Sequence, residues 1–430
     1  MEEKIIELGN KRFLHVINTD KFKTSFVAAF FLSDLVRKDI TINALIPAVL
    51  TRGSNNIQTM KDINIKLDSL YGASMDGSSD KIGDKQALQF YITTIDDKYA
   101  LNDEALLKES IELLLDVIYN PKFDSCDACI AGNCKCEKKF DATYVEQEKE
   151  NLKELIKARI NDKTQYSISR LIEEMFKASP YGAYKYGNIE DLEKITPENL
   201  YEQYEKVIAN SEVHFYVVSS TEVDAKWFEV CNKYENEVIS ATQINTGSTP
   251  GVKDFVERQD VTQGKLVLGY DVNVDKVKDL YKVQVYNAIL GGSSNSKMFQ
   301  NVREKESLAY TARSTYLKHK STLMIFAGIE IDKYDKALVT IEKQVEDMRI
   351  GEFSDEDIKD AKVFIENIMR SYVDSQDVLI DLSMGQHVMG MKDSIETMIE
   401  NINNVTREDI LYVANNVKLN TKYFLTGKEE

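Results

Sequence analysis

Several residue types and patterns are scarce in this chain of 430 residues. It has 5 prolines and no low-complexity tract, which argues against long disordered arms. The longest apolar run, Phe26 to Leu32, has the length of a strand and is far too short to cross a bilayer. The first residues, Met1 to Ile5, are charged and form no apolar stretch, so we expect no signal peptide and a cytoplasmic protein.

Positive charge is also in short supply. Lysine and arginine number 54 against 71 acidic residues, which gives a formal net charge of −17. This balance argues against nucleic acid or an anionic membrane surface as a partner, whereas a basic peptide is electrostatically compatible. The apolar fraction of 43% is typical of a globular protein, and the length suggests two domains.

Histidine occurs at only 4 positions, and no two of them are near in sequence: His15, His214, His319 and His387. A zinc site made of two histidines on one helix turn is therefore excluded. His214 lies in an apolar segment that reads as a buried strand, where a packed core residue is the simpler interpretation than a metal ligand. We expect His387 to be structural or exposed.

The order of the expected elements predicts an α+β fold. Strands cluster early, helices follow, and a final strand closes each half, as when helices pack on a sheet. A polar, turn-rich segment at 240–252 reads as a linker, so we expect an N-terminal domain at 1–239 and a C-terminal domain at 253–430. In the first half we expect strands at 5–8, 12–17, 24–33, 88–95 and 213–219, and helices at 45–50, 63–70, 105–117, 144–160 and 166–176.

The second half repeats the first. Gly53 corresponds to Gly292, and Phe90 corresponds to Phe326, at a nearly constant separation. Near the end of each half a helix begins at a threonine N-cap, Thr196 or Thr406, and leads into a strand. These parallels follow element order as well as residue identity, so we infer an internal duplication of two tandem homologous domains.

The segment from Ile289 to Tyr310 holds the strongest motif. Gly291 and Gly292 end an apolar helix, a short second helix follows at 298–302, and Tyr310, Ala312, Ser314 and Tyr316 are predicted to share one face of a strand. Arg303 and Tyr310 flank the start of that strand. A guanidinium and a phenol could together bind a peptide carbonyl or stabilise an oxyanion; the alternative is a solvated arginine and a half-buried tyrosine.

This segment resembles the C-terminal motif of the insulinase/pitrilysin peptidase family, which includes the mitochondrial processing peptidases. The resemblance implies two tandem α+β domains, each a mostly antiparallel sheet packed with helices. It also implies that Arg303 and Tyr310 bind substrate, together with Gly291 and Gly292. The matching residues are Gly291, Gly292, Ser296, Lys297, Met298, Phe299, Val302, Arg303, Glu304, Lys305, Leu308, Ala309 and Tyr310.

The zinc motif of that family, His-x-x-Glu-His on a helix, is absent. Counting back from Gly53 places its three positions at Ala44, Pro47 and Ala48, none of which can bind zinc or act as a base. Pro47 is also predicted to interrupt the helix. The distal ligand position falls on Leu155, beside Glu154. We therefore expect no cofactor at the family site.

The departure from the motif is typical of a non-catalytic subunit. In some pairs of this family a zinc-bearing sibling acts beside a catalytically dead one, so we expect such a sibling or a second copy as partner and a peptide or protein as substrate. The chain is most similar to a non-catalytic bacterial member associated with 5-aminopentanol modification of elongation factor P. Two alternatives stay open: a client-binding scaffold without peptidase context, and an active peptidase with a different metal site.

A cysteine-rich insert at 126–136 has no counterpart in the family pattern. Its residues are Cys126, Cys129, Cys134 and Cys136. The first pair has the spacing of a zinc or iron–sulfur half-site, and four thiolates suit a structural zinc. Two disulfides or free thiols are the alternatives, although disulfides are disfavoured in a reducing cytoplasm. Cys231 is expected in the core.

Overall fold

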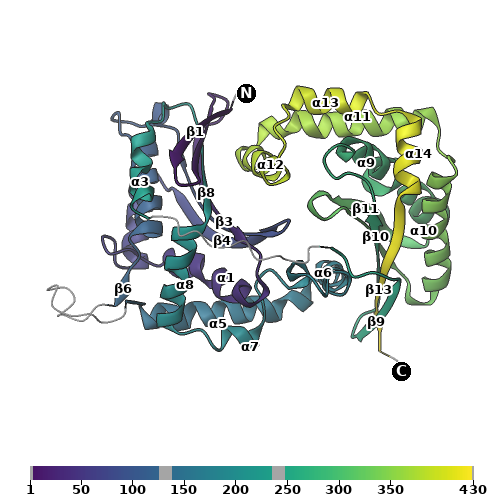
Figure 1. Cartoon of the computed structure of the whole chain (residues 1–430), viewed down its shortest axis with the longest axis horizontal. Helices are drawn as coiled ribbons and strands as arrows, with labels where there is room; N and C mark the ends of the chain where they lie inside the picture. Colours follow the sequence, from purple (N-terminus) through teal and green to yellow (C-terminus); the bar gives the residue numbers. More distant parts are fainter. Residues whose placement is uncertain (1–2, 125–137, 235–246, 429–430) are drawn as a thin grey trace. The chain divides into compact units, whose positions relative to one another are not determined.

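The computed structural model describes residues 3–124, 138–234 and 247–428, and every structural statement below concerns these residues (Figure 1). They form two compact units. The first comprises the described parts of 1–157 and 183–244, and the second those of 158–182 and 245–430. None of the helices in these ranges is long and apolar enough to cross a lipid bilayer.

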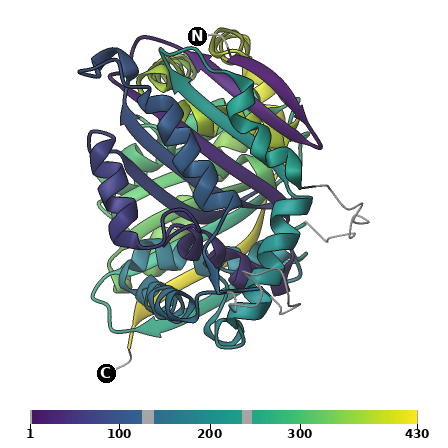
Figure 2. The ribbon, with the colours of Figure 1, turned by 90° about the vertical axis from the view of Figure 1, so that its left-hand side faces the viewer.

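The first unit is built on a six-stranded sheet with the order β1-β2-β8-β3-β5-β4. All neighbouring strands are antiparallel except the pair β2 and β8. Helices lie over one face of the sheet (Figure 2). The strands are β1 (Glu3–Gly9), β2 (Arg12–Asn18), β3 (Thr24–Asp34), β4 (Ser74–Ile82), β5 (Lys85–Ile95) and β8 (Glu212–Ser219), with a separate pair of β6 (Phe123–Asp124) and β7 (Lys139–Phe140).

The helices of this unit supply most of its core. α3 is the most apolar of the long ones, with ten of its fourteen residues buried. The α-helices are α1 (Ile40–Leu50), α2 (Met60–Ser69), α3 (Leu106–Tyr119), α5 (Ala142–Ala158), α7 (Ile189–Leu192) and α8 (Pro197–Asn210). Shorter helical segments are η1 (Arg37–Asp39), η2 (Asp97–Tyr99) and η5 (Ala225–Lys233).

The second unit is built on a five-stranded sheet with the order β11-β12-β10-β13-β9. Its strands are β9 (Lys253–Gln259), β10 (Gly264–Val272), β11 (Ala309–Leu317), β12 (Thr322–Ile329) and β13 (Val417–Gly427). Its helices are η3 (Arg159–Asn161), α6 (Lys163–Met175), η4 (Pro180–Gly182), α9 (Leu280–Asn287), η6 (Ala288–Gly292), η7 (Met298–Lys305), η8 (Lys318–Lys320), η9 (Ile331–Lys333), α10 (Tyr334–Arg349), α11 (Asp355–Ser371), η10 (Tyr372–Asp374), α12 (Gln376–Met389), α13 (Ile395–Asn403) and α14 (Arg407–Asn415).

The two sheets share one topology, which confirms the predicted fold of two tandem homologous halves. Five strands of the first sheet, β2-β8-β3-β5-β4, match β9-β13-β10-β12-β11 in order. The direction of each pairing matches as well, because β2 with β8 and β9 with β13 are the parallel pairs. α1 and α9 therefore hold equivalent places, as do α5 and α11, which are each 17 residues long.

The helix α6 comes from the first half of the sequence but packs in the second unit. Its Leu171 joins a cluster with Val267 and Tyr423. Successive β10 residues face opposite sides of the sheet, so Val267 meets α6 while Leu266 and Leu268 enter the larger core on the other face. A side chain at Gly269 would collide with Leu171 and Met175, and its absence lets α6 lie close to β10.

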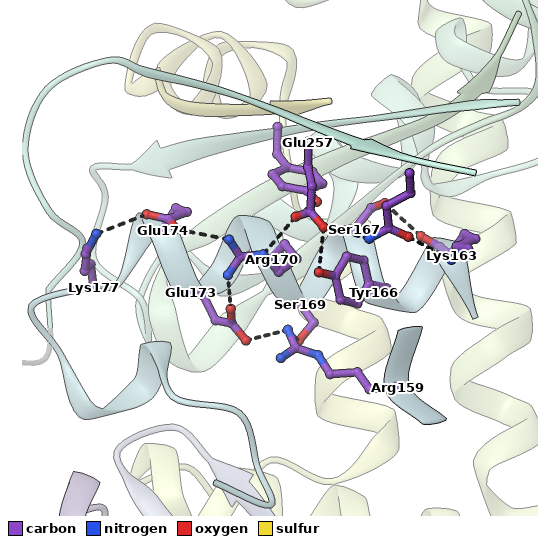
Figure 3. A network of polar contacts seen from close by, with 12 residues as sticks. Arg159, Lys163, Tyr166, Ser167, Ser169, Arg170, Glu173, Glu174, Lys177 and Glu257 are labelled. Carbon is purple, nitrogen blue, oxygen red and sulfur yellow. Dashed lines mark hydrogen bonds and ion pairs between the residues drawn. The ribbon is translucent and has the colours of Figure 1, made fainter. Parts of the chain in front are cut away.

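A polar network also attaches α6 to the second sheet (Figure 3). Glu257 on β9 accepts hydrogen bonds from the hydroxyls of Tyr166 and Tyr423, each at 2.7 Å, and from Arg170 Nε at 3.2 Å. Arg170 also pairs with Glu173, which in turn binds Arg159. Burial alone would raise the pKa of Glu257, but the hydrogen bonds from Tyr423 and Tyr166 outweigh it and lower that pKa.

Candidate functional site

The helix α1 holds the three positions where the zinc motif would lie. Nine of its eleven residues are buried, including Ala44 and Pro47, and Ala48 is half-buried. A methyl group and a pyrrolidine ring offer no lone pair to a metal. The residues present at this place do not fit a zinc ion.

Pro47 does not interrupt the helix, contrary to the sequence prediction. α1 continues through it to Leu50, and Thr51 caps the end by donating both its N–H, at 3.2 Å, and its hydroxyl, at 3.1 Å, to the carbonyl of Pro47. The burial of nearly the whole helix outweighs the single backbone hydrogen bond that proline removes. The ring packs against Gly77 of the edge strand β4, where an added Cβ would lie 3.0 Å from Pro47 Cβ.

Amides, rather than metal ligands, satisfy the polar groups around α1. Asn43 donates to Gln86 Oε1 at 2.9 Å and accepts from Gln203 at 2.8 Å. Gln86 donates in turn to the carbonyl of Ile40 at 3.1 Å. These three side chains come from distant segments and no local pattern links them, so sequence reasoning missed this network.

The position of the distal zinc ligand also holds a residue without a ligand atom. Leu155 on α5 is 53% exposed, and its neighbour Glu154 pairs with Lys157 at 2.7 Å on the surface. Glu148 is the buried carboxylate of this helix, and it pairs with Arg52 just after α1. That ion pair joins α5 to the end of α1, so the Glu148 carboxylate already has a structural partner.

The histidines of the first unit form a buried pair. His15 Nε2 lies 2.8 Å from His214 Nδ1, and Glu3 and Glu212 contact the outer ring nitrogens at 2.6 and 3.1 Å. His214 is thus packed within the sheet, as expected. In the second unit, burial and then the neighbouring Lys318 lower the pKa of His319 to about 4, so this ring is neutral at physiological pH.

The cysteine cluster, Cys126, Cys129, Cys134 and Cys136, lies outside the described residues, so its structural zinc stays a prediction. Cys231 is described, and it is buried in the first core as expected. Burial raises the pKa of its thiol to about 11, so at neutral pH it is an inert thiol.

The glycine pair of the motif lies at the end of η6, where close packing explains it. A Cβ on Gly291 would lie 2.6 Å from the backbone nitrogen of Ser314 on β11. A Cβ on Gly292 would lie 2.8 Å from Asn287 Nδ2. Both glycines thus allow this helix end to touch the strand and its own preceding turn, and Ser293 then leaves the helix in an extended conformation.

Arg303 lies on η7 with its side chain 44% exposed. Its guanidinium stacks on Phe299, 4.7 Å from the ring centroid, and lies 3.5 Å from Glu304. The stacking fixes the direction of the side chain while leaving N–H donors exposed to a ligand.

Tyr310 is displaced by a bulge at the start of β11. Ala309 pairs with Ile329 and Thr311 with Gly328, so Tyr310 is the extra residue between them. The prediction that Tyr310 shares a face with Ala312 and Ser314 is therefore wrong: those two are buried and Tyr310 is 79% exposed. Among the described contacts, Arg303 and Tyr310 form no hydrogen bond with each other, although they flank the same turn.

A comparison of the whole chain identifies its family. The chain is 34% identical over 419 residues to the "Probable inactive metalloprotease YmfF" of Bacillus subtilis, and the match covers 96% of each protein. The chain belongs to the M16 peptidase family. The predicted resemblance to the insulinase/pitrilysin peptidases is thereby confirmed.

The M16 assignment agrees with two further comparisons. The family model described as "Peptidase M16 inactive domain" matches residues 194–363. A conserved protein from Enterococcus faecalis V583 has a TM-score of 0.86 at 26% identity, covering 100% of this chain and 99% of that one. A peptidase M16 inactive domain from Pseudomonas fluorescens has a TM-score of 0.78 at 13% identity, with 100% and 99% covered. This M16 member has the fold of the family, with no zinc ligand at the described motif positions Ala44, Pro47 and Ala48.

Proposed function

We propose that this chain is the non-catalytic subunit of an M16 zinc peptidase pair and contributes peptide-binding surface to it. The observation that carries the proposal is a contrast between the two halves. The zinc positions have no ligand atoms, with Ala44 and Pro47 buried and Ala48 half-buried, whereas Arg303 and Tyr310 are exposed. Loss of the chemistry with retention of binding groups is what an accessory subunit requires.

The chemistry of the exposed groups suits an extended peptide. Peptide carbonyls accept charge-assisted hydrogen bonds from a guanidinium, and a phenol can donate one more or pack on a side chain. The segment from Gly291 to Ser296 lies beside β11 through the contact of Gly291 with Ser314. A partner with the intact His-x-x-Glu-His motif would supply the metal, and a second copy of this chain would not.

The test is peptide cleavage by this chain mixed with a zinc-motif M16 sibling from the same host. Arg303→Ala removes one charged hydrogen-bonding group, which contributes about 1.5–3 kcal/mol, so we expect turnover to fall by about 10–100-fold. Lys305→Ala, on the same exposed helix, is the matched control and should cleave like the wild type. Size-exclusion chromatography should show the same complex for all three proteins. Unchanged cleavage by Arg303→Ala would refute the role assigned to it.

A second candidate is a client-binding scaffold that serves elongation factor P modification without any cleavage. The lack of zinc ligands at Ala44, Pro47 and Ala48 is as compatible with a scaffold as with a subunit of a peptidase pair, because a scaffold needs no metal. Mass spectrometry of elongation factor P from a deletion strain distinguishes the two. Loss of 5-aminopentanol from the factor, restored by the Arg303→Ala variant, would support the scaffold over the peptidase subunit.

A further inference from the structure

A pocket of about 380 Å³ lies within the second unit, between the α9–η6 helix, the strand β11 and the helix α11. Pockets that bind small ligands have volumes of about 300–1,000 Å³, so this one suits a small molecule or the end of a chain. Residues from all three elements contribute to its lining, among them Asn287, Ser314 and Ile365. It belongs to the second unit, whereas α1 belongs to the first.

The pocket occupies the place in the second half that the zinc positions occupy in the first. α9 is the counterpart of α1, β11 of the edge strand β4, and α11 of α5. In the first half Pro47 packs directly against Gly77 of the edge strand. In the second half Asn287, which corresponds to Ala48 at the separation of Gly53 and Gly292, accepts a hydrogen bond from Ser314 at 2.7 Å, and both residues line the pocket.

One side of the pocket is polar. The side-chain oxygen of Gln284 is buried there and has no hydrogen-bond partner among the described residues. Asn287 Oδ1 already accepts from Ser314, so Gln284 Oε1 is the amide oxygen of the lining that still lacks a donor. A buried acceptor without a partner favours a ligand that carries an N–H or O–H group.

The lining also includes a cation. Among the described lining residues, Lys318 alone carries a formal charge at neutral pH. Burial lowers the pKa of Lys318, and Asp381 on α12 acts in the opposite direction. Its Nζ lies 3.0 Å from where a Cβ on Gly385 would be, so this glycine leaves room for the ammonium. A partly desolvated ammonium favours an anion, and Lys318 is one of the lining residues.

The other side of the pocket is apolar and belongs to α11. Ile365, Ile368 and Met369 follow one another at helical spacing and line it. Ile365 and Met369 are buried, whereas Ile368 is 39% exposed. An exposed isoleucine at the rim of a pocket is covered when an apolar group enters.

We propose that this pocket binds a small carboxylate with an apolar chain, with the carboxylate on Lys318 and the chain along Ile365 and Ile368. Two sources share this chemistry. One is a peptide C-terminus with an apolar last residue, whose amide N–H would bind Gln284. The other is a medium-chain fatty acid, which has no such donor. The binding does not depend on the proposed role as a peptidase subunit, because the pocket lies within one unit and needs no partner.

Isothermal titration calorimetry of the full chain with octanoate and with acetyl-Ala-Ala-Leu tests the proposal. The uncharged octanamide and the C-terminally amidated tripeptide are the matched ligands. We expect at least one carboxylate to bind about tenfold tighter than its amide, and Lys318→Met to remove that difference. Lys359→Met, on an exposed part of α11, should leave it unchanged.

Gln284→Leu separates the two sources. Tighter binding of the tripeptide, lost in this variant, identifies a peptide C-terminus, whereas tighter binding of octanoate that the variant retains identifies a fatty acid; either supports the proposal. Circular dichroism and the Tm establish that each variant is folded. Binding of neither carboxylate, or equal affinities of folded Lys318→Met and the wild type, would overturn it.

Discussion

Replacing Leu171 by alanine tests whether α6 belongs to the core of the second unit. Leu171 is 0% exposed and packs between α6 and β10. Its Cδ2 lies 3.1 Å from where a Cβ on Gly269 would be, so the strand backbone forms one wall of the resulting cavity. β10 is hydrogen-bonded on both edges and cannot move into that space. Buried Leu→Ala changes cost about 2.7–5 kcal/mol, and we expect about 3 kcal/mol here.

Hydrogen exchange measured by mass spectrometry reports this loss strand by strand. A loss of about 3 kcal/mol should speed exchange in β10 and β13 by roughly 100-fold, with little change in β3 and β8 of the first unit. Leu155→Ala on α5, the helix that precedes α6 in the sequence, is the control, because Leu155 is 53% exposed and should change stability by less than about 0.5 kcal/mol. Faster exchange in β3 and β8, with β10 and β13 unaffected, would refute the assignment of α6.

Three further predictions concern acid stability, backbone packing and the exposed tyrosine. Because the pKa of Glu257 is lowered in the folded state, its contribution to stability is present above about pH 4.3 and is lost as the pH falls through the folded pKa. The Tm of Glu257→Gln should therefore fall less than that of the wild type between pH 5 and pH 3, and an equal fall would contradict this. Gly187→Ala should destabilise by about 2–4 kcal/mol in urea unfolding, because φ is +72° and the new Cβ would lie 1.8 Å from Thr41 Oγ1. Gly9→Ala, with φ +93° and open space, is its control and should cost about 1 kcal/mol. Tyr310→Ala should leave the Tm within about 2 °C, since the side chain is 79% exposed, yet lower cleavage by the pair; a large loss of stability would show that Tyr310 is structural.

Local signals in the sequence predict most of the elements. The helix that follows Thr196 begins with the expected threonine cap, followed by Pro197 at the first helical position, and the structure adds a capping box completed by Asn199. The helices expected at 144–160 and 166–176 are α5 and α6. Caps and helical periodicity depend on residues within one or two turns, so they can be read without knowing the fold.

Features that depend on distant partners could not be predicted in this way. The apolar face of α6 shows that the helix is buried but not that its partner is β10, almost a hundred residues later. The strand β4 was missed because Ser74–Ile82 is polar and edge-exposed, with little apolar alternation. The bulge at Tyr310 breaks the alternation by one residue, and no turn signal in the motif announces it.

One part of the candidate site could be predicted from the sequence, and another could not. The absence of zinc ligands at Ala44, Pro47 and Ala48 can be read by counting along a motif, and α1 places these residues together on one helix. The pocket of the second unit could not be found this way, since Gln284 and Lys318 are polar residues on separate elements and belong to no motif. Only the duplicated topology brings them to one place.

The most direct test of the account is affinity purification of this chain from its native host, followed by mass spectrometry of what accompanies it. The account predicts a roughly equal amount of an M16 protein with an intact His-x-x-Glu-His motif. Recovery of this chain alone, or as a dimer of itself without a zinc-motif sibling, would contradict the proposal that it is the non-catalytic half of a peptidase pair.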